Sequence, residues 1–141
     1  MDAIQSNKIN ANKINALFFI TRNIIIRLPA PLIIVTITIL SSQSTLPGPQ
    51  AFFGIDKLMH FTAYAFLAAA IGLWFSRESW SRKHLRNFIV CAAIASGYGV
   101  LDELHQYFVP GRTCDIWDWV ADTLGAAAGS AAVLLGSRKL L

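Results

Sequence analysis

The chain has 141 residues, of which 55% are hydrophobic and 14% are charged, and its mean hydropathy is +0.50. A soluble globular domain carries about one-quarter charged residues, so this composition excludes an ordinary soluble fold. The net charge is +4, but the Lys and Arg fall in short groups beside apolar runs, which is typical of membrane loops and argues against a nucleic-acid interface.

The N-terminal segment, residues 1–27, is predicted to lie in the cytoplasm or at the membrane surface. Met1–Asn15 is polar and rich in Asn, and we interpret it as a mobile or surface-lying tail. Ala16–Arg27 mixes Phe and Ile with two Arg, which fits a helix lying at the interface. The apolar run that follows is interpreted as an uncleaved first span, because no convincing signal-peptide cleavage site comes after it.

Residues 28–135 are predicted to form one domain of four membrane spans, followed by a tail at 136–141. About 20 helical residues are needed to cross roughly 30 Å of hydrocarbon. The predicted spans are Leu28–Ser44, Ile55–Phe75, Asn87–Tyr107 and Asp115–Leu135. A breaker at Leu46–Pro49, a polar basic stretch at Ser76–Arg86 and a turn at Val109–Gly111 separate them.

The basic residues are distributed unequally between the two sides of these predicted spans. Lys57 and Arg112 fall on one side, and all the other Lys and Arg fall on the opposite side. Cytoplasmic loops carry the excess of Lys and Arg, so both termini are expected to face the cytoplasm. The sequence therefore predicts an all-α, integral membrane four-helix bundle, N-in and C-in, with the lipid bilayer as its surroundings.

Most of the acidic residues gather toward the predicted outer side: Asp56, Asp102, Glu103, Asp115, Asp118 and Asp122. Asp56, His60 and Tyr64 recur at i, i+4 and i+8, so they lie on one stripe of the second span. The three acids of the fourth span share a stripe in the same way. A carboxylate turned toward lipid costs a few kcal/mol, so we predict that these stripes face one another as a polar cluster in the outer half of the bundle.

A structural interpretation of these residues stands beside the functional one. Asp56, Asp115 and Arg112 fall at helix ends, where they can act as caps or headgroup anchors. His60 can bond a neighbouring backbone group. In that case the polar cluster only fixes the register of the helices.

The polar residues also form a spaced pattern. It reads Asp56-Lys57-x-x-His60-Phe61-x-x-Tyr64-x-x-Leu67, then Asp102-Glu103-x-x-Gln106-x-Phe108-x-Pro110-Gly111-Arg112, then Asp118-x-x-Ala121-Asp122-x-x-Gly125. This pattern, over about Ser41–Gly129, resembles the VanZ-like family of membrane proteins. The family pattern usually has Asn at the position of Asp122, so this chain carries an extra acid there.

The resemblance implies a small, multi-pass protein of the bacterial inner membrane. The namesake of the family is associated with resistance to teicoplanin, a lipoglycopeptide that binds cell-wall precursors outside the membrane. The resemblance implies no particular reaction.

The leading hypothesis is a site that opens outward and binds or modifies a polar or lipid-linked cell-envelope molecule. In an enzymatic version Glu103 or His60 serves as general base, while Arg112 and Lys57 hold a phosphate or carboxylate of the substrate. The candidate catalytic residues are Glu103, His60 and Asp118. The candidate substrate-binding residues are Asp56, Lys57, Tyr64, Gln106, Arg112 and Asp122.

Three alternatives stay open. His60, Glu103, His105 and Asp118 are suitable metal ligands, but their spacing matches no metal motif, and Glu103 and His105 project about 200° apart on a helix, so no metal and no cofactor are assigned. A small transporter of protons, ions or solutes would have to form a homo-oligomer, for which the Gly125/Gly129 face is the candidate. An accessory subunit without chemistry is the third alternative.

Overall fold

The computed structural model describes residues 3–44 and 54–138, apart from the side chains of residues 3–9 and 11, and every regular element in that part of the chain is helical. The helices are α1 (Ala3–Arg27), α2 (Pro29–Ser41), α3 (Ile55–Gly72), α4 (Arg77–Arg82), α5 (His84–Tyr107) and α6 (Ile116–Arg138). The prediction of an all-α protein is confirmed. The breaker predicted at Leu46–Pro49 lies outside the described residues.

The N-terminal region corrects the prediction of a polar tail followed by a separate interfacial helix. Helix α1 already begins at Ala3, and α2 follows it after Leu28, whose backbone keeps right-handed helical angles. Backbone hydrogen bonds continue across this junction, from Leu28 N–H to Ile24 O at 3.1 Å and from Leu32 N–H to Leu28 O at 3.2 Å. The Asn-rich segment contains neither Gly nor Pro, so nothing in it stops a helix.

Two prolines mark the boundary between α1 and α2. Pro29 and Pro31 lie in the first turn of α2, where a missing N–H costs little. Pro31 cannot donate to the carbonyl of Arg27, and the indole N–H of Trp74 donates to that carbonyl instead, at 3.3 Å. The segment that follows α3 is therefore hydrogen-bonded to the junction between α1 and α2.

Length and composition identify three candidate membrane spans among the described residues: Asn12–Ser41, His84–Tyr107 and Ile116–Arg138. The first is 30 residues long and begins well before the predicted start at Leu28, because it includes the apolar end of α1. Helix α3 is not among the candidates, since Asp56, Lys57 and His60 occupy its first turns.

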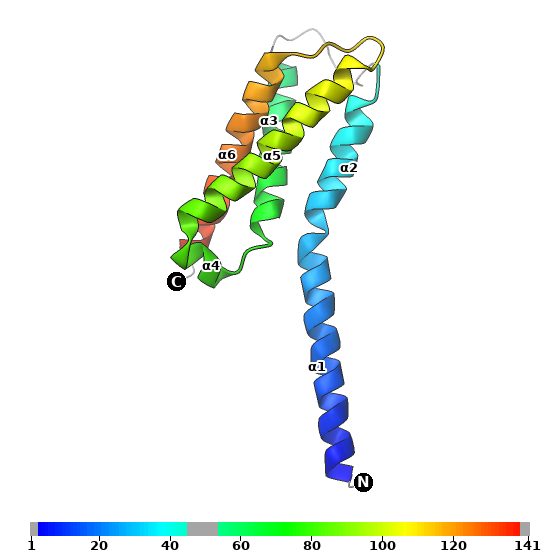
Figure 1. The fold of residues 1–141 in the computed structure, drawn as a ribbon, viewed down its shortest axis with the longest axis vertical. Helices are drawn as coiled ribbons and strands as arrows, with labels where there is room; N and C mark the ends of the chain where they lie inside the picture. Colours follow the sequence, from blue (N-terminus) through cyan, green and yellow to red (C-terminus); the bar gives the residue numbers. More distant parts are fainter. Residues whose placement is uncertain (1–2, 45–53, 139–141) are drawn as a thin grey trace.

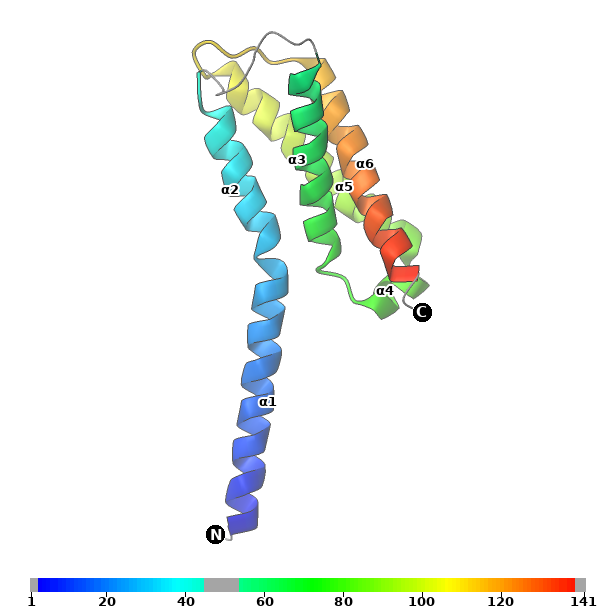
Figure 2. The ribbon, with the colours of Figure 1, turned by 180° about the vertical axis from the view of Figure 1, so that it is seen from behind.

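Helices α2, α3, α5 and α6 lie side by side, while α1 extends beyond them (Figures 1 and 2). Helix α3 packs most extensively against α6, and α5 contacts both. The polar stretch predicted at Ser76–Arg86 contains α4, whose N-cap residue is Ser76. The buried Trp80 of α4 donates its indole N–H to Gly72 O at 3.0 Å and so completes the end of α3.

Two glycines set the distance between α3 and α6. A Cβ atom on Gly125 would lie 2.1 Å from Phe61 O, and one on Gly129 would lie 2.0 Å from Ala65 O. The two backbones therefore touch, as small residues permit between helices in lipid. Since α3 occupies this face, a homo-oligomer through Gly125 and Gly129 would have to displace it.

The interior is divided along the length of the packed helices. Toward α4 the buried residues are mostly apolar: Leu67, Ala68, Ile71, Cys91, Ala95 and Ala126. At the opposite end, where α2 and α5 finish and α3 and α6 begin, the buried residues are mostly polar. The polar cluster is thus confined to one end of the fold.

Candidate functional site

A tight turn after α5 positions the first cation of the site. Gly111 has a φ of +83°, and Arg112 N–H donates to Val109 O at 3.1 Å. Pro110 followed by a residue with positive φ is the pattern of a type II turn, so the predicted turn is confirmed. It places Arg112 beside the ends of α2, α3 and α5, where its side chain lines a cavity.

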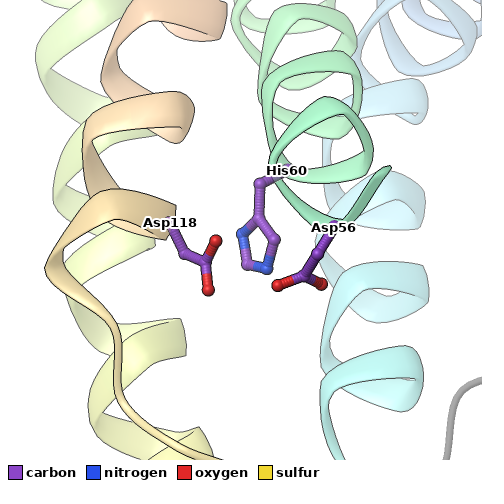
Figure 3. A group of neighbouring side chains, drawn as sticks. All are labelled: Asp56, His60 and Asp118. Carbon is purple, nitrogen blue, oxygen red and sulfur yellow. The ribbon is translucent and has the colours of Figure 1, made fainter. Parts of the chain in front are cut away.

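His60 lies at the centre of the polar cluster. Its imidazole sits between the carboxylates of Asp118 and Asp56, which come from α6 and from the preceding turn of α3 (Figure 3). Its ring also lies parallel to that of Tyr64, with centroids 6.4 Å apart and planes at 5°. Two members of the predicted stripe, His60 and Tyr64, therefore turn inward together, whereas Asp56 is exposed at the rim.

Two buried acids of the other helices, Glu103 and Asp122, each have a carboxylate oxygen within 4.8 Å of a His60 ring nitrogen. His60 Nδ1 lies 2.9 Å from Asp122 Oδ1 of α6, and Glu103 Oε2 of α5 accepts the Asp115 N–H at 2.8 Å. A Cβ on Gly99 would lie 2.7 Å from Asp122 Oδ2, so this glycine lets the carboxylate lie against α5. The second oxygens, Glu103 Oε1 and Asp122 Oδ2, are buried and have no hydrogen-bond partner among the described residues.

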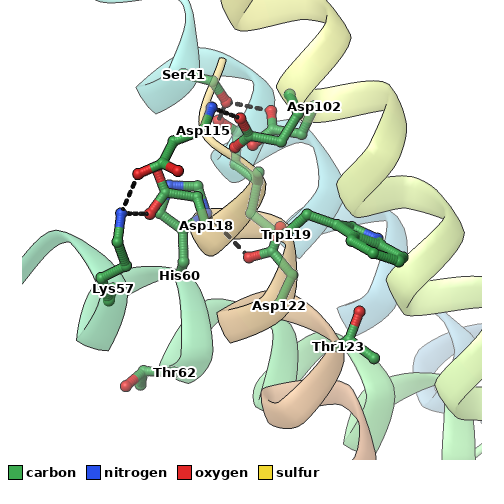
Figure 4. Close-up of polar contacts among 12 residues, drawn as sticks. Ser41, Lys57, His60, Thr62, Asp102, Asp115, Asp118, Trp119, Asp122 and Thr123 are labelled. Carbon is green, nitrogen blue, oxygen red and sulfur yellow. Dashed lines mark hydrogen bonds and ion pairs between the residues drawn. The ribbon is translucent and has the colours of Figure 1, made fainter. Parts of the chain in front are cut away.

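Lys57 forms ion pairs with two carboxylates at the start of α6 (Figure 4). Its Nζ lies 2.6 Å from Asp115 Oδ2 and 2.5 Å from Asp118 Oδ1, and the Asp118 side chain is only 5% exposed. The sequence-based prediction was that Lys57 holds a substrate phosphate or carboxylate. In the structure the charge of Lys57 is shared by two internal acids, and its role toward a substrate stays a prediction.

The pairing of Asp115 predicts a pH dependence of stability. Asp115 precedes the candidate span of α6, and the hydrogen bond from Lys57 lowers the pKa of its carboxyl, assisted by the Trp117 N–H at 2.9 Å. A lowered folded-state pKa means that the contribution is fully present above the ordinary Asp pKa of about 4 and is lost as pH falls through the lower value.

We therefore expect Asp115→Asn to reduce the thermal midpoint at pH 7 and to have a smaller effect as pH falls through the lowered pKa of Asp115, where the wild-type carboxyl becomes protonated as well. The expected loss is about 1 kcal/mol or less, because Lys57 and Asp115 are each 35% exposed. Midpoints measured in one detergent from pH 7 downward check this. A difference that is constant over the whole range would contradict the assignment.

The end of α2 contributes to the site through Ser41 and Ser42, which meet Asp102 and His105 of α5. Asp102 Oδ1 accepts from Ser41 Oγ at 2.5 Å and Oδ2 accepts from Gln106 Nε2 at 3.2 Å, so both oxygens are satisfied. His105 projects away from Glu103 and meets Ser42 Oγ at 2.9 Å. Sequence reasoning missed Ser41, since nothing in the run of polar residues ending the first span distinguishes it from its neighbours.

A cavity of about 60 Å³ opens beside this cluster, between α2, α3 and α5. Its polar lining residues are Ser41, Asp56, His60, Tyr64, Asp102, Gln106 and Arg112. Its apolar lining residues are Ile37, Leu40, Met59 and Ala63. The Tyr64 hydroxyl and Arg112 Nε are buried and have no hydrogen-bond partner in the described part of the chain.

Two groups of side chains have the geometry to hold a metal ion. Asp56, His60 and Asp118 form one group, and His60, Glu103 and Asp122 form the other, each with its potential ligand atoms within 4.8 Å of one another. Asp122 joins the second group although sequence reasoning did not include it among the ligand types. His105 belongs to neither group.

The structure brings the predicted site residues to one end of the fold. His60, Glu103, Asp118, Asp122 and Lys57 form the cluster of buried and half-buried charges. The remaining candidates line the cavity beside it: Asp56, Tyr64, Gln106 and Arg112. Their catalytic and substrate-binding roles remain predictions.

Long apolar helices around a buried polar cluster define a helical protein of the membrane type. A family model described as VanZ/LLP1 matches residues 2–136, and the chain belongs to this family. The resemblance found in the spaced polar residues is thereby confirmed. Searches of curated proteins and of solved structures returned no match.

Proposed function

We propose that the protein crosses the bacterial inner membrane four times, with both termini in the cytoplasm and the polar cluster near the outer surface. Helices α2 and α5 end where α3 and α6 begin (Figure 1). If α2 and α5 both cross, the chain between them has to return, and α3 is the long helix that makes this return. Its 18 residues extend roughly 27 Å, close to the hydrocarbon thickness.

The distribution of charge supports this orientation. Of the Lys and Arg within the described residues, only Lys57 and Arg112 belong to the end that carries the cluster. The positive-inside rule then assigns that end to the outside.

We propose further that the cavity binds an anionic, lipid-linked molecule of the cell envelope. The carrying observation is that Arg112 and Tyr64 line the cavity and that each has a buried donor, Arg112 Nε and the Tyr64 hydroxyl, without a partner among the described residues. A buried donor left unsatisfied costs about 1–3 kcal/mol, so a ligand that accepts from both is favoured. Arg suits a phosphate oxygen because its donors are arranged as a planar fork.

The shape of the cavity supports a ligand with an apolar part. Its apolar lining residues are side chains of α2 and α3, beside which a lipid chain can lie. About 60 Å³ has room for one small polar group rather than a whole headgroup. In an enzymatic version Glu103 is the general base, with His60 and Asp118 beside it.

The interior favours binding or chemistry at one face over transport through the protein. Beyond Tyr64 the packed interior of α3, α5 and α6 is lined mainly by Leu67, Ile71, Cys91 and Ala95. An ion following the carboxylates would meet this apolar region before the opposite end. An accessory role remains the alternative if no ligand is found.

The test is binding of a polyprenyl-diphosphate-linked wall precursor by the purified full-length protein in detergent. Arg112→Gln is expected to weaken binding at least about tenfold, since a hydrogen bond to a charged group contributes roughly 1.5–3 kcal/mol. Tyr64→Phe is expected to weaken it less. Arg77→Gln, which changes an exposed Arg at the start of α4, is the matched control and should bind as wild type does.

The same preparation distinguishes binding from chemistry. Loss of product formation in Glu103→Gln with retained binding would place Glu103 in the chemistry, as general base or as a metal ligand, and unchanged turnover would remove Glu103 from the role of base. Equal affinity for the precursor and for the phosphate-free polyprenol would reject the anionic ligand. We extend the proposal to resistance against teicoplanin, which binds cell-wall precursors. A protein that holds the precursor at this site would compete with the drug for it. Arg112→Gln should therefore abolish protection against teicoplanin in cells.

A further inference from the structure

We propose that His60, Glu103 and Asp122 form a binding site for one divalent metal ion of the Mn²⁺ or Zn²⁺ type. The three side chains come from α3, α5 and α6, and their potential ligand atoms lie within 4.8 Å of one another. The proposal concerns the buried cluster and does not depend on the identity of any lipid ligand.

The first argument is the balance of charge around these residues. Glu103 and Asp122 are 5% and 0% exposed, so their charges are removed from water. The nearest Lys is unavailable, because Lys57 is paired with Asp115 and Asp118. A buried carboxylate without a compensating charge is strongly destabilising. A protonated His60 would compensate one of the two acids, whereas a divalent cation bound with a neutral imidazole compensates both.

The second argument is the pair of unsatisfied oxygens. Glu103 Oε1 and Asp122 Oδ2 are buried without a hydrogen-bond partner among the described residues, although the other oxygen of each acid is bonded. Asp102 provides the contrast. It is also a buried Asp at this end of the fold, yet both of its oxygens accept hydrogen bonds and it belongs to neither group of potential ligands. Each of the two proposed carboxylate ligands therefore keeps one oxygen that accepts no hydrogen bond from the described residues.

The third argument is the second coordination sphere of His60. A metal-bound His usually donates its other ring N–H to a carboxylate, which fixes the tautomer and orients the ring. Asp56 lies on the far side of the imidazole from Asp118 (Figure 3), in the position to accept such a bond. Nδ1, which now lies 2.9 Å from Asp122 Oδ1, would then turn its lone pair to the ion.

The donor set indicates the class of metal. One imidazole nitrogen with two carboxylates suits Zn²⁺ or Mn²⁺, whereas Ca²⁺ and Mg²⁺ prefer oxygen ligands alone. Three protein ligands leave at least one coordination position open. Because His60 also lines the cavity, that position is near a bound anionic group, and this last step alone rests on the proposed function.

The experiment is a metal titration of full-length protein purified in detergent and stripped with EDTA. Free Mn²⁺ is followed by electron paramagnetic resonance, and Zn²⁺ is added as competitor. We expect about one Mn²⁺ per chain, displaced by Zn²⁺, with an affinity lowered at least about tenfold in Glu103→Gln and in Asp122→Asn. Asp102→Asn is the matched control, and it should retain the wild-type stoichiometry.

Size-exclusion profiles show whether each variant is folded. Glu103→Gln and Asp122→Asn test the site independently, so one of them suffices if the other variant does not fold. Absence of stoichiometric Mn²⁺ and Zn²⁺ binding by wild type would overturn the proposal, and the two buried acids would then share a proton. Equal loss in Asp102→Asn would also overturn it, since binding would reflect acidity in general. No lipid is present in this titration, so its failure leaves the Arg112 experiment unaffected.

Discussion

Gly129→Ala is expected to separate α3 from α6 and to destabilise the protein by about 3 kcal/mol or more. Overpacking usually costs about 1–3 kcal/mol, when side chains can move aside. Here the added methyl group would lie 2.0 Å from a backbone carbonyl oxygen, that of Ala65, and no rotamer change relieves such a contact. Gly125→Ala, whose new atom would lie 2.1 Å from Phe61 O, should have a similar effect.

The measurement is the thermal midpoint of the purified protein, followed by size-exclusion chromatography. This readout is chosen because helices in detergent can persist after their tertiary packing is lost. Gly97→Ala is the matched control on α5, since a Cβ there would meet nothing within 4 Å. It should be neutral or stabilising by up to about 1 kcal/mol. A Gly129→Ala variant as stable as Gly97→Ala would show that α3 does not pack against α6 at this distance.

Lys57→Met is expected to destabilise the protein by about 1–3 kcal/mol, which is less than the cost of removing one partner from a fully buried ion pair because Lys57 itself is 35% exposed. The largest part comes from Asp118, whose side chain is 5% exposed and would lose the cation at 2.5 Å. Asp115 contributes less because water reaches it. The same thermal midpoint measures this effect.

Two variants separate charge from packing at Lys57. Adding Asp118→Asn to Lys57→Met removes the uncompensated charge and should recover part of the loss, because the two sites are coupled. Arg82→Met is the control for a surface pair. It breaks the contact with Glu78 at 3.3 Å, in which both side chains are about three-quarters exposed, and should cost less than about 1 kcal/mol. If Lys57→Met costs no more than Arg82→Met, the internal ion pair is not formed.

Much of the helical layout followed from local pattern. All four predicted spans match helices that begin and end within a few residues of the prediction: α2, α3, α5 and α6. An apolar run of about 20 residues predicts a helix that avoids water, so the position of each helix could be predicted from the sequence. The N-terminal prediction failed for the opposite reason, because polar Asn and Lys were treated as the sign of a tail although none of them interrupts a helix. Hydropathy thus predicts which segments are apolar better than it predicts where a helix begins or ends.

The stripes of acids were also accessible from spacing. The i, i+4 relation of His60 and Tyr64 and the i, i+4 relation of Asp118 and Asp122 predicted which side chains share a face. The high cost of carboxylates in lipid predicted that these faces turn inward, and all four side chains do lie inside the packed helices.

The sequence by itself determined the all-helical class, the family and the set of polar residues at one end, because these depend on composition and on spacing within single helices. Only the tertiary structure decided which acid meets which partner. Lys57 reaches Asp118 across 61 residues of sequence and Ser41 reaches Asp102 across the same separation. Such contacts depend on how each helix is rotated about its axis and on how closely α3 and α6 approach. Backbone contact at Gly125 and Gly129 sets that approach, and with it which carboxylate oxygens are left free.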